Sequence, residues 1–407
     1  MRRFILYTFS AVACLSVILF WPMPHKKAPR PVVILKKPVV KQETVAFKPQ
    51  VLKKISDKQI TLTKIPFTRL PGWHNANIKK SLYAFRVSCK IFLKQNPTHP
   101  VGTEHITLQA KDWYPACKAA LSIHAFYEST ARLFFEKWFY PIEFAKRKPL
   151  SGTFTGYYMP SLKGNLTKTE TYNTPIYGLP RNLSWGGSAR LYTREAIDNG
   201  ILKKKAPVLA WINSPIDRLF LEIEGSGVIK LANGKHLYLG YAGENGAPYT
   251  SIGNVLIKKG VLTKDNASKR GIKRYLESQP KKTNTILHKN SSFVFFQDLK
   301  HPMGLGAKGI ALTPGYSLAI DKKWIPLGAP LWLDTIIPDK QTDTEKQFQR
   351  LMIAQDTGGA ITGLMRGDIY WGSGKRASYL GEHMKHDGRY WLLLPKHTIN
   401  KLTKSPT

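Results

Sequence analysis

The sequence predicts a mainly β fold of the α+β class with a helical N-terminal part. From Gly152 onward, short apolar runs alternate with Gly, Pro and Asn, which is the pattern of strands joined by turns. Before Gly152, apolar residues recur at helical spacing instead. The 407 residues leave room for two domains and a sizeable core.

The first segment predicts a membrane anchor. Arg2 and Arg3 precede residues 4–21, which are eighteen residues without a charge. A helix of that length can just span a bilayer. Signal-peptide cleavage at the small residues 11–13 and lipid attachment at Cys14 are alternatives, but both would cut within the apolar run. We therefore expect an uncleaved anchor over residues 1–21.

Residues 22–65 predict a basic tether. They carry eleven Lys and Arg residues against two acidic ones, include prolines and show no sustained period. Such a composition favours an extended, solvated chain. Stretched out, it would reach on the order of 100 Å, so a membrane-held domain could act at a distance.

The folded part is expected to begin with helices near Pro66. Apolar residues in 78–92 fall at helical spacing, and Asn77 is a plausible N-cap. A second helical stretch covers 116–138, and its aromatic side chains are assigned to the core. Later helical patterns cover only about 251–259 and 267–278. The expected strands include Val208–Ile212, Arg218–Ile223, His236–Leu239, Ser292–Phe296 and Pro330–Leu333.

Three cysteines bear on the compartment. Besides Cys14, the chain has Cys89 and Cys117, which could form one disulfide if the chain is exported to an oxidising compartment. Two free buried thiols are the alternative.

The charge is strongly basic. With 62 Lys+Arg and 26 Asp+Glu, the net charge is +36, which favours polyanions or anionic surfaces. Basic residues are spread along the whole chain without a recognisable nucleic-acid module, so we expect no nucleic-acid partner. A nucleic-acid binder remains an alternative that charge alone supports.

Two motifs are set aside. Residues 304–309 fit G-x-G-x-x-G, but Pro302 precedes them and no helical pattern follows, so we expect no nucleotide site. His383 and His386 have H-x-x-H spacing without further ligands, so we expect no metal and no cofactor.

The candidate chemistry lies in residues 350–372. Asp356 and Asp368 each sit at the edge of a short apolar run that reads as a strand. Burial among apolar residues should raise the pKa of a carboxyl group, as a general acid at neutral pH requires. Ordinary Asp-Gly turn chemistry is the alternative.

Three other stretches carry aromatic or polar side chains beside glycines. Thr155-Gly156-Tyr157-Tyr158 reads as the end of a strand, on which adjacent tyrosines face opposite ways. Aromatic faces with a polar tip suit sugar rings. The loops 224–227 and 240–246 are Gly-rich, and hairpin turns would explain them equally well.

These stretches resemble one known family. Residues 153–160 are similar to its F-T-G-Y-Y segment, 224–227 lie where it has Q-G-S-G, and 240–253 are similar to its Y-A-G-x-N-G segment. Residues 350–372 closely resemble its "three-aspartate" segment, with Asp321 as the remaining aspartate. The family is that of membrane-bound lytic murein transglycosylase A, glycoside hydrolase family 102. The likeness spans about residues 66–395.

The resemblance implies a double-psi β-barrel with a second β-rich domain inserted into it. The barrel would comprise residues 66–158 plus 292–400, and the insert residues 159–291. A glycan strand would lie in the groove between the two.

The resemblance also implies an activity. The family, a group of peptidoglycan lytic exotransglycosylases, cleaves the β-1,4 bond between N-acetylmuramic acid and N-acetylglucosamine and leaves 1,6-anhydromuramic ends. Asp368 falls on its catalytic acid, which then acts as base, while Asp356 and Asp321 would position neighbours. The implied substrate contacts are Thr155, Gly156, Tyr157, Tyr158, Glu224, Gly225, Ser226, Tyr241 and Asn245.

The implied setting is the bacterial cell envelope, with the membrane anchor at the N-terminus and the catalytic part in the periplasm. Partners would be glycan strands of peptidoglycan, with cell-wall synthases as further candidates. One departure is Glu224, where the family usually has Gln. It opens the alternative of a muramidase-type hydrolase in which Glu224 activates water. A non-catalytic peptidoglycan-binding protein is the other alternative.

Overall fold

The computed structural model describes residues 49–403 apart from 56–58, 125–126, 182–191 and 265. The predicted anchor and most of the predicted tether lie outside the described residues. Among the helices that are described, none combines the length and the apolar character needed to cross a bilayer.

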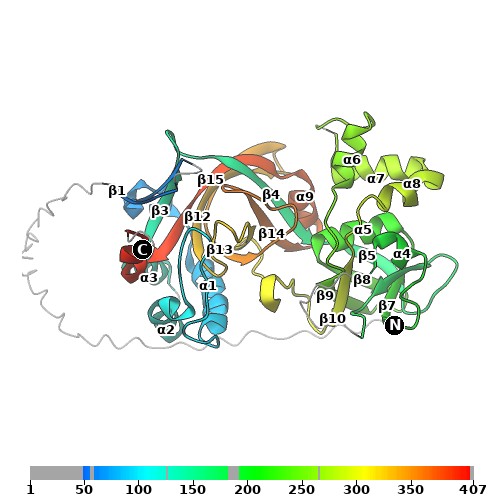
Figure 1. Cartoon of the computed structure of the whole chain (residues 1–407), viewed down its shortest axis with the longest axis horizontal. Coiled ribbons are helices and arrows are strands. Elements are labelled where there is room, and N and C mark those ends of the chain that lie inside the picture. Colours follow the sequence, from blue (N-terminus) through cyan, green and yellow to red (C-terminus); the bar gives the residue numbers. More distant parts are fainter. Residues whose placement is uncertain (1–48, 56–58, 125–126, 182–191, 265, 404–407) are drawn as a thin grey trace, which may run out of the picture. The chain divides into compact units, whose positions relative to one another are not determined.

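Six strands form a closed barrel (Figure 1). Their hydrogen-bonded order is β15, β12, β13, β11, β14 and β4, and pairing of β4 with β15 closes the ring. β11 with β13 and β14 with β4 are parallel pairs, whereas the other neighbours are antiparallel. The predicted fold class is thus confirmed. The bounds are β4 Gly152–Met159, β11 Ser317–Ile320, β12 Pro330–Asp339, β13 Thr344–Asp356, β14 Gly367–Ser373 and β15 Lys385–Pro395.

The alternation of side chains decides which face of the barrel strands is free for function. Phe154, Leu318 and Ile369 are completely buried in the main hydrophobic core. Successive side chains on a strand point to opposite faces. The neighbours Thr155 and Asp368 therefore lie on the face that the core does not fill.

The end of the predicted tether is folded instead of solvated. β1 (Gln50–Ile55) and β2 (Ile60–Lys64) pair with each other, and β2 joins the barrel sheet through β3 (Phe139–Ala145). Leu52 and Leu62 are buried in the core. The basic composition of the whole segment outweighed its local patterns, which are interrupted by Lys53 and Lys54 in β1 and alternate as Ile60-Thr61-Leu62-Thr63 in β2. These two strands correct the predicted boundary.

The helical N-terminal part packs beside the barrel. It comprises α1 (Lys79–Phe92), α2 (Tyr114–Ser122) and α3 (Glu128–Trp138), so the single helix predicted over 116–138 is two. Cys89 of α1 and Cys117 of α2 form a disulfide. Of the two alternatives that the sequence left open, a disulfide or two free thiols, the structure has the disulfide. Closing a chain separation of 28 residues contributes on the order of 3 kcal/mol in the chain-entropy view.

The insert has a sheet of its own. Its order is β10, β9, β8, β5, β7 and β6, in which β5 and β8 are parallel. β10 pairs with β9, so the chain returns to the barrel only after Leu299 and not at the predicted residue 292. The bounds are β5 Ser161–Asn165, β6 Thr174–Tyr177, β7 Val208–Ile212, β8 Ser226–Leu231, β9 His236–Glu244 and β10 Val294–Leu299.

Helices accompany this sheet, and one of them replaces a predicted strand. Residues 218–223 belong to the helix α5 (Pro215–Glu224). The Ser214 side chain caps its first turn and Pro215 occupies the first position, which are helix-start signals that the short apolar run concealed. The other helices of the insert are α4 Arg194–Asp198, α6 Ile252–Lys258, α7 Lys269–Ser278 and α8 Pro280–Leu287.

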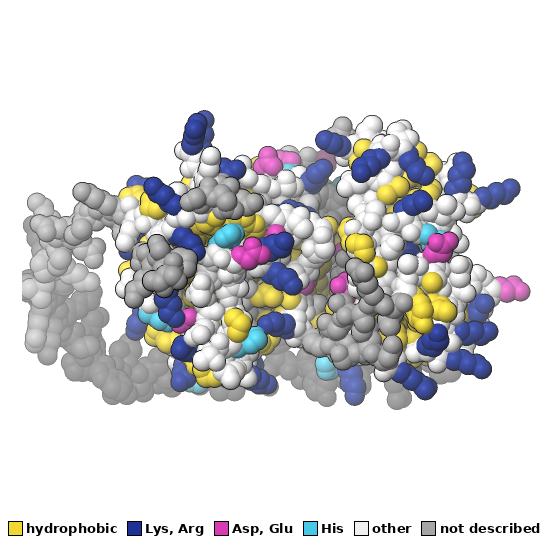
Figure 2. Space-filling view, in the orientation of Figure 1, with side chains coloured by type: hydrophobic (Ala, Val, Ile, Leu, Met, Phe, Trp, Pro, Cys, Tyr) yellow, Lys and Arg dark blue, Asp and Glu magenta, His cyan; other side chains and the backbone are white. Residues whose placement is uncertain are grey.

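The basic composition is visible on the surface. Figure 2 shows Lys and Arg side chains over most of the face that it presents, whereas Asp and Glu side chains are few. The basic groups are dispersed on this face and do not form one stripe.

A buried ion-pair cluster holds the insert together. Arg194 of α4 bonds both carboxylate oxygens of Glu222 on α5, and its Nε donates to the Asn290 carbonyl at 2.9 Å. Arg218 lies 3.4 Å from the same Glu222 carboxylate and also pairs with Asp198. The cluster links α4, α5 and the segment that leads back to β10.

Replacing Arg194 should destabilise the insert strongly. An Arg194→Leu variant leaves buried Glu222 with only the long contact to Arg218, and removing one partner of a buried pair costs about 3–5 kcal/mol. Urea unfolding of the full chain measures this loss. Lys235→Leu, on an exposed turn of the same insert, is the control and should change the free energy of unfolding by less than about 0.5 kcal/mol.

Candidate active site

Two aspartates meet across a single strand of the barrel. Ala319 of β11 lies opposite Asp356 of β13 on one side and opposite Asp368 of β14 on the other. Residues directly opposite in a sheet share a face. With neighbouring strands about 4.8 Å apart, the two Cα atoms are roughly 10 Å apart, and both carboxylates project from one face.

A bulge brings Asp356 onto this row. The register between β11 and β13 shifts by one residue just before Ala319, so Gln355 is turned away and Asp356 takes the position opposite. Gln355 is buried, and its Nε2 donates to the Ala84 carbonyl at 2.9 Å and to Ser88 Oγ at 3.0 Å on α1. The N-terminal helix thereby fixes the bulge that positions Asp356.

Asp368 receives a single side-chain hydrogen bond. Thr155 Oγ1 donates to Asp368 Oδ1 at 2.8 Å, and Arg366 Nη2 donates to the same hydroxyl at 2.8 Å. Burial raises the pKa of Asp368 to about 6, against the opposing effects of the Arg366 charge and the Thr155 hydrogen bond. A larger fraction of this carboxyl group than of an ordinary aspartate therefore keeps its proton as the pH approaches neutrality, and the pKa is raised in the direction expected from the sequence.

Asp356 is held by more donors. The Tyr157 hydroxyl donates to its Oδ2 at 2.6 Å, and the Thr357 N–H donates to its Oδ1 at 2.8 Å. Burial raises its pKa to about 6, hydrogen bonds from Tyr157, Thr357 and Ala307 oppose the rise, and the charge of Asp368 adds to it. Because its oxygens are already engaged, Asp356 is less free than Asp368 to exchange a proton with a ligand.

Asp321 lies outside the row formed by Asp356 and Asp368, and it holds the loop that precedes β14. It follows β11, its Oδ2 accepts from the Gly363 N–H at 2.7 Å, and its Oδ1 accepts from the Lys323 N–H at 2.9 Å. These bonds fix the segment that leads into β14. The geometry agrees with a positioning role for this aspartate.

The adjacent tyrosines of β4 diverge, as residues on a strand must. The Tyr157 hydroxyl donates to Asp356, and its ring centre lies 5.3 Å from that of Tyr370. The Tyr158 hydroxyl donates to Glu382 at 2.7 Å on the other side and accepts from Lys269 at 2.9 Å. Only Tyr157 belongs to the row of carboxylates.

Glu224 reaches from the end of α5 to the barrel. Its Oε2 accepts from the Tyr158 N–H at 3.1 Å, and its Oε1 lies 3.4 Å from Lys269 Nζ. Burial raises the pKa of Glu224 to about 7, the Lys269 charge and the Tyr158 N–H oppose this, and the Asp368 charge adds to it. Glu224 is thus near enough to sense Asp368, but its contacts are with Lys269 and the backbone.

The other predicted contacts differ in what they do. A Cβ on Gly156 would lie 2.4 Å from Trp371 Nε1, so this glycine serves close packing. The Asn245 side chain is saturated by backbone groups, because its Nδ2 donates to the carbonyls of Tyr192 and Ser291 at 2.8 Å and its Oδ1 accepts from the Phe293 N–H at 2.9 Å. These two predicted contacts therefore have evident structural roles.

Three further predicted residues lie on the insert. Gly225 has φ of 70° and ends α5, which is a left-handed conformation that glycine adopts without strain. Ser226 is buried at the start of β8. Burial raises the pKa of Tyr241, and the charges of Glu244 and Asp356 raise it further, so Asp356 lies near enough to affect this tyrosine.

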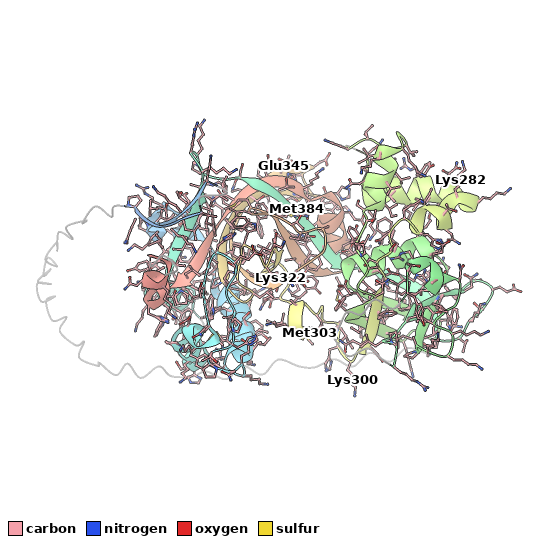
Figure 3. All side chains as sticks on the ribbon, viewed as in Figure 1. Lys282, Lys300, Met303, Lys322, Glu345 and Met384 are labelled. Carbon is pink, nitrogen blue, oxygen red and sulfur yellow. A yellow bond between two sulfur atoms is a disulfide. The ribbon has the colours of Figure 1, made fainter. Side chains whose placement is uncertain are left out.

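Sequence reasoning missed Arg366, Tyr370 and the loop 304–309. The loop covers Tyr370, since a Cβ on Gly304 would lie 2.5 Å from the Tyr370 hydroxyl. In Figure 3, Met303 lies on the segment that leads from β10 to this loop. The glycines of this loop, which fit a nucleotide-binding motif in the sequence, permit its close approach to Tyr370. They were the sequence signal from which this contact could have been predicted.

A metal site finds no support in the described part of the chain. No group of three or more His, Cys, Asp or Glu residues there is arranged to hold an ion. His383 Nδ1 lies 2.8 Å from the Tyr379 carbonyl oxygen, and His386 Nδ1 lies 3.3 Å from Glu345.

Comparison with known proteins gives two family matches. Residues 153–297 match the "MltA specific insert domain" and residues 316–394 match the "3D domain". The two matches cover the insert and most of the barrel strands that carry the aspartates.

Individual relatives agree with these matches. The chain is 37% identical over 242 residues to "Membrane-bound lytic murein transglycosylase A homolog" of Buchnera aphidicola, which is 59% of this chain and 65% of that protein. The crystal structure of MltA from Neisseria gonorrhoeae aligns with a TM-score of 0.69 and 32% identity over 85% of this chain and 95% of that one. E. coli MltA with bound chitohexaose aligns with a TM-score of 0.57 and 27% identity, over 78% and 87%.

The buried charge of Asp368 should cost stability in a pH-dependent way. Its pKa rises from 3.8 to about 6 on folding, so between these values the folded state keeps a proton that the unfolded state has lost. Stability from this group is therefore lost as pH rises from about 4 to 6.

An Asp368→Asn variant should consequently be more stable than the parent at pH 8, by about 1–3 kcal/mol, and nearly equal to it at pH 4. Urea unfolding at both pH values tests this. The exposed Asp298→Asn substitution is the control. Equal stability of Asp368→Asn and the parent at pH 8 would contradict the burial argument.

Proposed function

This chain belongs to the MltA family of lytic murein transglycosylases, and we propose that it is itself a lytic transglycosylase that cleaves peptidoglycan. The bond cleaved is the β-1,4 linkage between N-acetylmuramic acid and N-acetylglucosamine. The single observation that carries the proposal is Asp368, a partly buried carboxyl group with a raised pKa and one hydrogen-bond donor. The chitohexaose bound to the E. coli relative is a β-1,4-linked amino-sugar chain and supports this class of substrate.

In the first step, Asp368 donates its proton to the glycosidic oxygen. The bond between C1 of the muramic acid ring and that oxygen breaks, and positive charge develops on the ring. The N-acetylglucosamine end leaves as an alcohol. The Asp368 carboxylate that results is stabilised by the Thr155 hydroxyl and the Arg366 charge.

In the second step, Asp368 acts as the base. It takes the proton from the C6 hydroxyl of the same muramic acid, and the freed oxygen forms a bond to C1. No water enters, so the product is a 1,6-anhydro ring. One carboxyl group suffices because the nucleophile is already attached to the sugar, and intramolecular attack contributes several kcal/mol, on the order of 7, relative to recruiting a second molecule.

Asp356 and Asp321 support this chemistry without transferring protons. Asp356 orients the Tyr157 hydroxyl, and the Tyr157 ring packs against Tyr370. Asp321 holds the loop that leads to β14. Both arrangements keep Asp368 in place while its protonation state changes.

Hydrolysis with Glu224 as a second carboxylate is less well supported. A water-activating base needs a free oxygen facing the sugar. Glu224 instead accepts from the Tyr158 N–H and pairs with Lys269. A protein that only binds glycan would not need a carboxyl group with a raised pKa and a free oxygen such as Asp368.

The relatives support a setting in the cell envelope. The Buchnera relative is named as membrane-bound, which supports the cell envelope. Residues 1–21 are proposed as the anchor, with the catalytic part in the periplasm. The disulfide between Cys89 and Cys117 supports an oxidising compartment. Cell-wall synthases remain candidate partners.

Digestion of peptidoglycan tests the activity. Mass spectrometry of the products released by the full-length protein should show anhydro ends, one water (about 18 Da) lighter than reducing ends. Asp368→Asn should lower the rate on the order of 10²–10⁴-fold, because it cannot donate a proton. The exposed Asp298→Asn control should retain the rate. Reducing ends among the products would point to hydrolysis instead.

The pH profile tests the state of Asp368. If its protonated form starts the reaction, kcat/KM should fall tenfold per pH unit above about 6. Thr155→Val removes a hydrogen bond that lowers the pKa of Asp368, so the fall should move to higher pH. Thr153→Val, two residues earlier on β4, is the matched control. A shift to lower pH in Thr155→Val would exclude the assignment.

A further inference from the structure

A cationic cavity of about 480 Å³ lies beyond the end of β4. It is bounded by β4 and the start of β5, by α5, α7 and the end of β8 in the insert, and by one side of the helix α9 (Lys375–His383). Five basic and two acidic side chains line it. They are Lys230, Lys269, Arg270, Lys273 and Lys375, with Asp217 and Glu382.

Both acidic groups are already engaged. Asp217 pairs with Lys273 at 2.5 Å. Glu382 accepts from the Tyr158 hydroxyl at 2.7 Å and from Ser378 Oγ at 3.0 Å. The Asp217 charge is therefore paired with Lys273, and the Glu382 charge acts on Lys269.

Three basic side chains of the cavity lack a counter-charge among the residues that the structure describes. Lys230, Arg270 and Lys375 are exposed, and none of them forms an ion pair within the part of the chain that is described. Arg270 and Lys375 also stand in the first turns of α7 and α9, where the helix dipole disfavours positive charge. Like charges gathered in one concave site attract an anion and raise its local concentration.

The cavity lies within reach of a substituent on the proposed substrate. Asp368 is opposite Thr155, and Ser373 of the same strand is opposite Met159, which lines the cavity. The four-residue step from Thr155 to Met159 along β4 corresponds to roughly 13 Å. A peptide of four residues, fully extended, spans about the same length.

The chemistry of the substrate supplies a matching anion. Muramic acid carries a short peptide on its lactyl group, and that peptide has free carboxylates. Apolar groups of the cavity, from Leu162, Phe220 and Leu221, suit the alkyl portions of such a peptide. Resting on the function proposed above, we infer that this cavity binds carboxylates of the stem peptide and makes the protein selective for peptide-bearing glycan strands.

Binding to three forms of one substrate tests the inference. Full-length protein carrying Asp368→Asn, so that nothing is cleaved, is titrated with peptide-bearing strands, with the same strands after their carboxylates are converted to amides, and with strands stripped of peptide by an amidase. Peptide-bearing strands should bind on the order of tenfold more tightly than either of the others, which is the sum expected for three exposed charge contacts.

Two triple variants in the same background complete the experiment. Lys230→Gln, Arg270→Gln and Lys375→Gln together should remove this preference and leave the affinity for stripped strands unchanged. Lys203→Gln, Lys282→Gln and Lys300→Gln together remove equal charge from exposed positions outside the cavity, and should keep the preference. Figure 3 shows Lys282 on α8 and Lys300 just after β10.

The outcomes separate the two proposals. Equal affinity of the parent for all three strands, or a preference that survives in the cavity variant, would overturn the inference. A preference lost equally in both triple variants would assign it to net charge and also overturn it. The absence of anhydro products in the digestion experiment would count against the proposed activity alone, since this binding assay needs no turnover.

Discussion

The site depends on burying two carboxyl groups on one face of a closed barrel, on either side of one short strand. β11 has Asp356 as its neighbour in β13 and Asp368 as its neighbour in β14. Burial makes both negative charges costly, so each group favours its protonated form. The same burial that raises the pKa of Asp368 also lowers the stability of the folded protein when this group is ionised. The surrounding core must offset that loss.

The two aspartates differ through their donors. Asp356 accepts from the Tyr157 hydroxyl and the Thr357 N–H, which occupies both of its oxygens. Among the described residues, Asp368 accepts a hydrogen bond only from the Thr155 hydroxyl, which in turn accepts from Arg366. A carboxyl group with a free oxygen can deliver and retrieve a proton, whereas a saturated one orients its neighbours. The difference in hydrogen-bond donors therefore distinguishes the proposed roles of two side chains that are chemically identical.

The insert contributes through contacts that span long stretches of sequence. Lys269 of α7 bonds the Tyr158 hydroxyl, 111 residues away, and pairs with Glu224 at the end of α5. A carboxylate placed where the family usually has an amide is thereby neutralised by a lysine of the insert. The same lysine borders the cationic cavity, so its charge acts both on Glu224 and within the cavity.

The sequence by itself determined the helical beginning, the β-rich remainder and the stretch that carries Asp356 and Asp368, because periodicity and local motif chemistry depend on near neighbours along the chain. It did not reveal β1 and β2, whose short apolar patterns lie in a segment of strongly basic composition, or the helix that replaced the strand expected at 218–223. Only the tertiary structure decided that a bulge at Gln355 places Asp356 opposite Ala319, on the face that carries Asp368. It also decided that Thr155 lies opposite Asp368. Register between strands distant in sequence is set by the packing of the whole barrel, which no local pattern encodes.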